Sequence, residues 1–209
     1  MSAERNNIKI FVSSTVYDFE TELRNIFLTL DGFGYDVYMS KEGTIPLDSR
    51  LSNLVNCVNG VEECDVFLGI VRPCVGTGIL EKNGRSITAQ EFDKALELKL
   101  PRFILADYRV EFAHKFLKLM NIDIDKIPLN IEKYKEDKDG RVVKEVRPNL
   151  LVNGECVDIY RKSIQNDIYP RTNRIGNWAQ PYMNREEIYR FIESQFKDVE
   201  RIKRLINGK

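Results

Sequence analysis

The sequence predicts an α/β fold in which a parallel sheet is covered by helices on both faces. Four short apolar segments alternate with helical patterns over roughly the first hundred residues, and this alternation is typical of βαβ units. The segment at 65–71 is apolar almost throughout, as a parallel strand covered on both faces should be. With 209 residues, of which 43% are hydrophobic, the chain is long enough to build a core without disulfides or a metal.

Each element of the sheet is indicated by its own pattern. Strands are expected at 8–12, 35–39, 65–71 and 101–106, because short apolar or β-branched runs there are bounded by polar residues or turns. Helices are expected at about 17–30, 49–59 and 88–99, where apolar side chains recur every three or four residues. Thr15 and Asp18 stand three residues apart, so they are expected to cap the first helix.

The regular alternation of strands and helices ends in the second half of the chain. Another helix is expected at about 111–120, and Asp139-Gly140 between β-prone flanks indicates a charged hairpin. A further helix is expected near 157–164, followed by a long amphipathic helix over 184–206. We therefore expect an α/β domain at 1–107 and an α+β extension at 108–209 that packs on it and ends in the long helix.

Composition excludes several classes of protein. Basic and acidic residues both total 32, so no net field attracts nucleic acid or a membrane surface, and neither is expected as a partner. No apolar run approaches the roughly 18 residues of a membrane span. His114 is the only histidine, which rules out multi-histidine metal sites and favours a packed or solvated helix position for it. The four cysteines form no C-x-x-C pair, and are expected to be reduced, mostly buried thiols of a cytoplasmic protein.

Two loops form the expected ligand-binding region, because ligands of open parallel sheets bind at the carboxyl ends of the strands, where the strand order reverses. The loop after the first strand supplies hydroxyls and the amides of a helix N-terminus, which suit a phosphate or a ribose. The loop after the third strand supplies glycines and guanidinium groups, which pair with phosphate. In the competing interpretation the hydroxyls only cap a helix and the arginines are solvated. The candidate binding residues of the two loops are Ser13, Ser14, Thr15, Arg72, Arg85 and Ser86.

Glu91 is the candidate reactive group. It lies in the first turn of the helix expected after the third strand, so its carboxylate should face the same end of the sheet as the two loops. Breaking an N-glycosidic bond passes through an oxocarbenium-like cation, which one carboxylate can stabilise or capture without a metal or a histidine. The competing interpretation is structural, because Thr88 and Glu91 also have the spacing of a capping box.

A series of motifs runs in order through residues 8–107. They are Ile10-Phe11-Val12-Ser13-Ser14-Thr15 with Asp18, Cys64-Asp65-Val66-Phe67-Leu68-Gly69-Ile70, Gly84-Arg85-Ser86-Ile87-Thr88-x-x-Glu91-Phe92, and Pro101. This series resembles the bacterial domain of unknown function 4062, a family similar to Toll/interleukin receptor (TIR) domains and to nucleoside 2-deoxyribosyltransferases. The resemblance implies a flavodoxin-like fold and attack on the glycosidic bond of NAD or a nucleoside. It maps the relatives' key glutamate onto Glu91 and assigns ligand contacts to Ser13, Ser14, Thr15 and Asp18.

Three functions are expected, in this order. The first is an enzyme that cleaves or rearranges NAD or a related nucleotide at the ribosyl bond in a bacterial anti-phage response, with Ser14, Thr15 and Arg72 holding phosphate or ribose. The second is a non-catalytic module that senses a nucleotide or assembles as a homo-oligomer or with an effector protein. The third is base exchange between nucleosides, although Gly84-Arg85-Ser86-Ile87-Thr88 replaces the Asp-x-Gly-Thr run of that family. No cofactor is expected, because NAD or a nucleotide enters as substrate.

Overall fold

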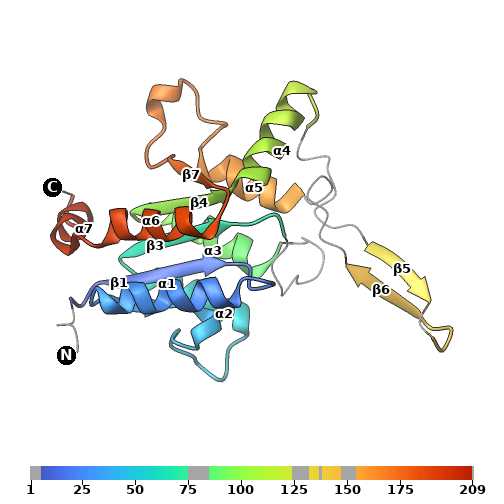
Figure 1. The fold of residues 1–209 in the computed structure, drawn as a ribbon, viewed down its shortest axis with the longest axis horizontal. Coiled ribbons are helices and arrows are strands. Elements are labelled where there is room, and N and C mark those ends of the chain that lie inside the picture. The colour runs from blue at the N-terminus through green and yellow to red at the C-terminus, as the bar shows by residue number, and fades with distance from the viewer. Residues whose placement is uncertain (1–5, 75–84, 124–131, 137, 147–153, 209) are drawn as a thin grey trace.

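The computed structural model describes residues 6–74, 85–123, 132–136, 138–146 and 154–208. Its centre is a five-stranded sheet of β1 (Lys9–Ser14), β2 (Asp36–Tyr38), β3 (Val66–Val71), β4 (Arg102–Asp107) and β7 (Ala179–Tyr182). The strands lie in the order β2-β1-β3-β4-β7, and every neighbouring pair is parallel (Figure 1). This is the flavodoxin-like α/β arrangement that the sequence predicts.

Helices cover both faces of the sheet, and each face has its own hydrophobic core. One core contains side chains of α1 (Glu20–Gly32), α6 (Arg185–Phe196) and α7 (Val199–Ile206). The other contains side chains of α2 (Asn53–Glu62), α3 (Ile87–Glu97), α4 (Tyr108–Leu119) and α5 (Gly154–Ser163). Figure 1 shows α1 and α6 on the same side of the strands. The two cores together explain why the strands tolerate so few polar residues.

The central strand β3 shows how the sequence builds these layers. All of its residues are buried, and successive side chains point to opposite faces, as the pleat requires. Leu68 and Ile70 therefore join the core under α1, whereas Phe67 joins the core under α3. Gly69 stands where a Cβ atom would lie 2.4 Å from the ring of Phe92, so the close approach of α3 to the sheet depends on this glycine.

The start of α1 differs from the prediction. The helix begins at Glu20, and its N-cap residue, Phe19, makes no side-chain capping bond. The expected cap by Thr15 and Asp18 is therefore wrong. The chain instead makes a tight turn before the helix, in which the Phe19 N–H donates to the Val16 carbonyl at 3.0 Å and Asp18 adopts a φ of 53°.

The C-terminal helix also differs, because two helices replace the expected single one. Asn184 caps α6 and accepts a hydrogen bond from the Glu187 N–H at 3.0 Å. The first of the two helices ends at Phe196, however, and Asp198 caps a new helix, α7, by accepting from the Arg201 N–H at 2.9 Å. An aspartate that can bond backbone amides locally favours such a restart over a continuous helix.

The second half of the chain completes the sheet. Its last strand, β7, was not expected from the sequence, and it pairs with β4 so that Ala179 lies opposite Ile104. The helix that follows, α6, packs against α1 and is fixed there by the Tyr35 hydroxyl, which donates to the Phe196 carbonyl at 2.7 Å. The sheet and both of its cores therefore extend across residue 107, where the first domain was expected to end.

The hairpin and two further helices agree with the prediction. Strands β5 (Glu132–Glu136) and β6 (Val142–Val146) pair antiparallel on either side of Gly140, whose φ is 72°. The helices α4 and α5 occupy the regions expected for them. Short 3-10 turns at Ser40–Glu42 and Arg171–Asn173 complete the described elements.

His114 and the cysteines behave as their sequence contexts predict. His114 is buried on α4, where its ring meets that of Tyr160 edge-on with centroids 5.3 Å apart, and burial lowers its pKa. The four cysteines are free thiols, of which Cys57, Cys64 and Cys156 are buried.

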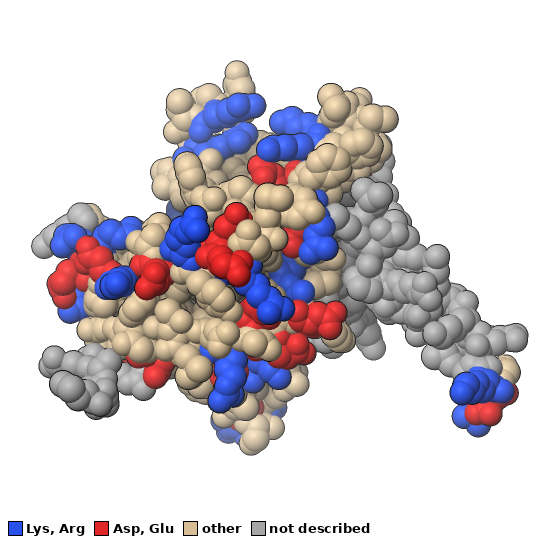
Figure 2. Space-filling model, viewed as in Figure 1, with Lys and Arg blue, Asp and Glu red and all other residues tan. Residues whose placement is uncertain are grey.

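Within the described ranges, none of the helices is both long enough and apolar enough to cross a bilayer. On the face drawn in Figure 2, basic and acidic side chains are interspersed.

Candidate functional site

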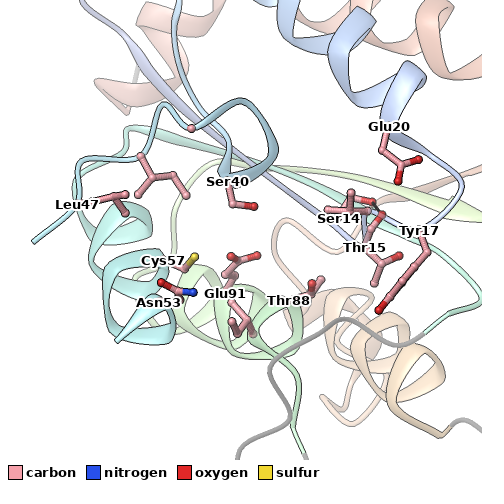
Figure 3. A pocket seen from close by; sticks show the side chains of 14 residues that line it. Ser14, Thr15, Tyr17, Glu20, Ser40, Leu47, Asn53, Cys57, Thr88 and Glu91 are labelled. Atoms are coloured by element: carbon pink, nitrogen blue, oxygen red, sulfur yellow. Dashed lines mark hydrogen bonds between the residues drawn. The ribbon is translucent and has the colours of Figure 1, made fainter. Parts of the chain in front are cut away.

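A hollow of about 480 Å³ opens at the carboxyl end of β1 (Figure 3). Its walls come from the loops after β1 and β2, from α2 and from the N-terminal part of α3. This volume lies in the range of small-molecule binding sites, which is about 300–1,000 Å³. Its polar lining residues are Ser14, Thr15, Tyr17, Glu20, Ser40, Asn53, Thr88 and Glu91.

The hollow is displaced from the position expected for it. We expected a crevice bounded by the loops after β1 and β3, where the strand order reverses. The structure places the hollow beside β1 on the side of β2, between α2 and α3, and among the described residues that directly follow β3 none lines it. The tight packing of α3 on the sheet at Gly69 brings the first turns of α3 under the end of β1 instead.

Glu91 does not cap its helix. Ser86 is the N-cap of α3, and its side chain accepts a hydrogen bond from the Ala89 N–H at 3.1 Å. The helix therefore starts before Thr88, and the interpretation of Thr88 and Glu91 as a capping box is wrong. The Glu91 carboxylate points instead toward β1, where its Oε2 atom accepts a hydrogen bond from the Ser13 hydroxyl at 2.5 Å.

The surroundings of Glu91 give its carboxyl group unusual acid–base behaviour. The side chain is only 5% exposed, and burial raises the pKa of Glu91 to about 7, although hydrogen bonds from Ser13 and Cys57 act in the opposite direction. Burial, followed by the charge of Glu91, raises the pKa of the Cys57 thiol to about 12. The thiol therefore keeps its proton near neutral pH, whereas Glu91 is present in both protonation states and can act as a base, an acid or a nucleophile.

Ser13, Ser14 and Thr15 lie where the sequence places them, at the end of β1, but they have different roles. Ser13 is buried and donates to Glu91. Ser14 and Thr15 line the hollow, and the Thr15 hydroxyl lies 2.9 Å from the sulfur of Cys74. Asp18 is exposed in the turn before α1 and does not line the hollow.

The arginines expected to bind phosphate hold protein groups instead. Arg72 donates to the carbonyl oxygens of Thr15, at 3.1 Å, and Tyr17, and its guanidinium lies over the Phe19 ring at 4.5 Å. Arg85 forms ion pairs of 2.8 Å with Asp93 and with Asp158.

Ser86 is likewise engaged within the fold, since its backbone N–H donates to the buried Glu155 carboxylate at 2.7 Å. Arg72, Arg85 and Ser86 are all absent from the lining of the hollow. Arg72 holds the loop after β1, whereas Arg85 and Ser86 join the start of α3 to α5. The structure therefore brings none of the three residues to Glu91.

Sequence reasoning missed several groups that lie around Glu91. Figure 3 shows Cys57 and Asn53 to the left of the Glu91 carboxylate and Ser40 above it. Cys57 and Asn53 belong to α2, and Ser40 follows β2. The sequence signal for Cys57 was its residue type alone, because cysteines are commonly buried, and this does not indicate which helix it meets. The packing of α2 against α3 is a tertiary contact that no local pattern encodes.

Other features of the surface lack the chemistry of this hollow. Within the described ranges, the structure has no group of three or more His, Cys, Asp or Glu side chains placed to hold a metal. A larger hollow, of about 900 Å³, lies along α6 and β7. Its lining carboxylates, Glu111 and Glu187, remain partly exposed, so it lacks a buried group comparable to Glu91.

Comparison with protein families adds one match. A family model described as "Domain of unknown function (DUF4062)" matches residues 9–149. This region covers well over half of the chain and includes every residue that lines the hollow at Glu91. No curated protein and no solved structure matches the chain.

Proposed function

The chain belongs to the family of domain of unknown function 4062, and from this starting point we propose that it breaks N-glycosidic bonds of nucleosides or nucleotides, NAD among them. The observation that carries the proposal is the buried Glu91 carboxyl group, whose pKa lies at about 7, at a hollow of about 480 Å³. Residues with strongly altered pKa values in a concave site are candidates for chemistry.

The reaction needs little beyond this carboxylate. The bond between C1′ of the ribose and the base nitrogen breaks, and both bonding electrons leave with the base. The cation that develops at C1′ is stabilised by the ionised Glu91, or captured by it as an ester. Water then adds its oxygen to C1′ and releases one proton, or the nitrogen of a second base takes its place and yields an exchanged nucleoside.

The surrounding groups support this assignment. The bond from Ser13 fixes one carboxylate oxygen of Glu91, which orients the group without a histidine or a metal. The hydroxyls of Ser14, Thr15 and Ser40 line the same hollow and have the donors and acceptors that ribose hydroxyls require. The role in anti-phage defence stays a prediction from the family resemblance.

A second candidate function is binding without chemistry. The observation that favours it is that Glu91 already accepts hydrogen bonds from Ser13 and Cys57, so the carboxyl group is satisfied within the fold. A domain of this kind would bind a nucleoside or nucleotide in the hollow and release it unchanged.

One experiment separates the two functions. The chain is incubated with NAD, with nicotinamide riboside, and with a deoxynucleoside plus an acceptor base, and products are separated by chromatography. Wild type should release base, and Glu91→Gln should reduce the rate by about 100-fold or more. The matched control is Glu193→Gln, which alters an exposed glutamate of α6 and should leave the rate unchanged.

The remaining outcomes count against the proposed chemistry. Equal rates for wild type and Glu91→Gln would remove Glu91 from the reaction. A rise in the melting temperature with ligand, without any product, would establish the binding function instead.

A further inference from the structure

The charges around the hollow carry a further inference about its substrate. Among the described lining residues, Glu20 and Glu91 carry carboxyl groups, and none is a lysine or an arginine. Glu91 is buried at the base of the hollow, whereas Glu20 is exposed at the first residue of α1. A ligand therefore meets negative charge and neutral polar groups on these walls.

The two arginines expected to bind phosphate, Arg72 and Arg85, do not line the hollow. Arg72 is held by the carbonyl oxygens of Thr15 and Tyr17, and these bonds stabilise the loop that forms one wall of the hollow. Arg85 is held by carboxylates of α3 and α5. Each guanidinium would have to leave charged or carbonyl partners to reach a phosphate, and such partners are costly to abandon.

An aromatic ring lies at the rim of the same hollow. Tyr17 lines the hollow and is 59% exposed, and Figure 3 shows its ring on the side of Thr15 and Thr88. A flat heteroaromatic base can stack on a tyrosine ring, and a positive charge on that base adds a cation–π attraction.

From these charges and this ring, and resting on the proposed function, we infer that the hollow selects N-ribosylpyridinium nucleosides, in which a cationic base is joined to a ribose without phosphate. The positive base is attracted by Glu20 and Glu91 and stacks on Tyr17. A 5′-phosphate brings negative charge toward the same carboxylates, and no cation on the described walls offsets the repulsion. NAD carries this base but also two phosphates, so it is expected to be the poorer substrate.

The leaving group of such a nucleoside suits a site with one carboxylate. When the C1′–N bond breaks, the bonding electrons neutralise the ring nitrogen, so the base departs uncharged and needs no proton. Water supplies the oxygen at C1′ and releases one proton to solvent. Glu91 is therefore needed in its ionised form alone, which a cationic base beside it favours.

A binding experiment tests the charge selection without any turnover. Calorimetry near pH 8 compares 1-methylnicotinamide, which is cationic because its ring nitrogen is methylated, with nicotinamide, which has the same ring without the charge. We expect the cation to bind wild type at least about tenfold more tightly. The preference should shrink in Glu20→Gln, an exposed change that the fold tolerates, and should persist in Glu193→Gln. Equal affinities of wild type for the two probes would overturn the inference.

A kinetic experiment separates this inference from the proposed function. The value of kcat/KM for nicotinamide riboside should exceed that for its 5′-phosphate, nicotinamide mononucleotide, by at least about tenfold. Turnover that favours the phosphorylated compound would overturn the inference and leave the glycosidic chemistry supported. Selective binding of the cation without release of base from any glycoside would support the charge selection and overturn the glycosidic chemistry.

Discussion

The stability of the protein should depend on pH through Glu91. An unfolded chain loses the proton of this carboxyl group near the ordinary value of 4.5, whereas the folded protein retains it until about pH 7. Between these values the folded state binds more protons than the unfolded state, so the free energy of unfolding falls as pH rises. The stabilisation by the protonated Glu91 is fully present below about pH 4.5 and is lost above about pH 7. Glu91→Gln removes this dependence, because its amide has a similar shape and does not titrate.

The magnitude follows from the two pKa values. The gap between 4.5 and about 7, at about 1.4 kcal/mol for each pH unit, amounts to about 3–4 kcal/mol. Near pH 4.5 the free energies of unfolding of Glu91→Gln and wild type should be similar. Near pH 8 the variant should be more stable than wild type by about 3–4 kcal/mol, because it avoids placing a negative charge in a buried site.

Urea denaturation followed by circular dichroism measures this difference at several pH values. Glu193→Gln serves as the control, and its difference from wild type should change little with pH because Glu193 is exposed. If the curves for wild type and Glu91→Gln run parallel from acid to alkaline pH, the reasoning about burial of Glu91 is refuted.

Three further predictions concern neighbouring residues. Ser13→Ala removes a donor to Glu91 that favours the ionised form, so the midpoint of the rate–pH profile should move upward by about one pH unit; an unmoved midpoint would contradict this. Arg85→Met breaks the ion pairs between α3 and α5, and should lower the free energy of unfolding in urea by about 3 kcal/mol with KM unchanged; a raised KM without loss of stability would indicate a ligand contact instead. Gly69→Ala places a Cβ atom 2.4 Å from the ring of Phe92 and should destabilise the fold by about 1–3 kcal/mol, measured as a lower Tm; an unchanged Tm would show that α3 can shift freely.

Much of the sheet could be predicted because its signals are local. The apolar run that forms β3 and the alternation of strands with helices are visible in the sequence, and they place β1 to β4 close to their observed positions. The strand β7 was missed because it is short and partly exposed, with Pro181 in its middle. It is held in the sheet by pairing with β4, a contact distant in sequence. The break between α6 and α7 was missed because the apolar stripe continues across it.

The site was predictable in its central residues but not in its extent. Motif order and the position after β3 singled out Glu91, and the end of β1 singled out Ser14 and Thr15, all of which line one hollow. The arginines were assigned to phosphate from their charge and loop position alone. Their partners lie on other elements, such as Asp158 of α5, and only tertiary structure shows that these guanidinium groups are already engaged.

The most direct test of the central claim is the pH dependence of base release. The claim is that the ionised, buried carboxylate of Glu91 breaks the glycosidic bond. Values of kcat/KM for nicotinamide release from nicotinamide riboside, measured from about pH 5 to about pH 9, report the essential group of the free enzyme. The rate should rise about tenfold per pH unit on the acid side and level off above about pH 7. A rate that stays constant or falls over this range would contradict the claim.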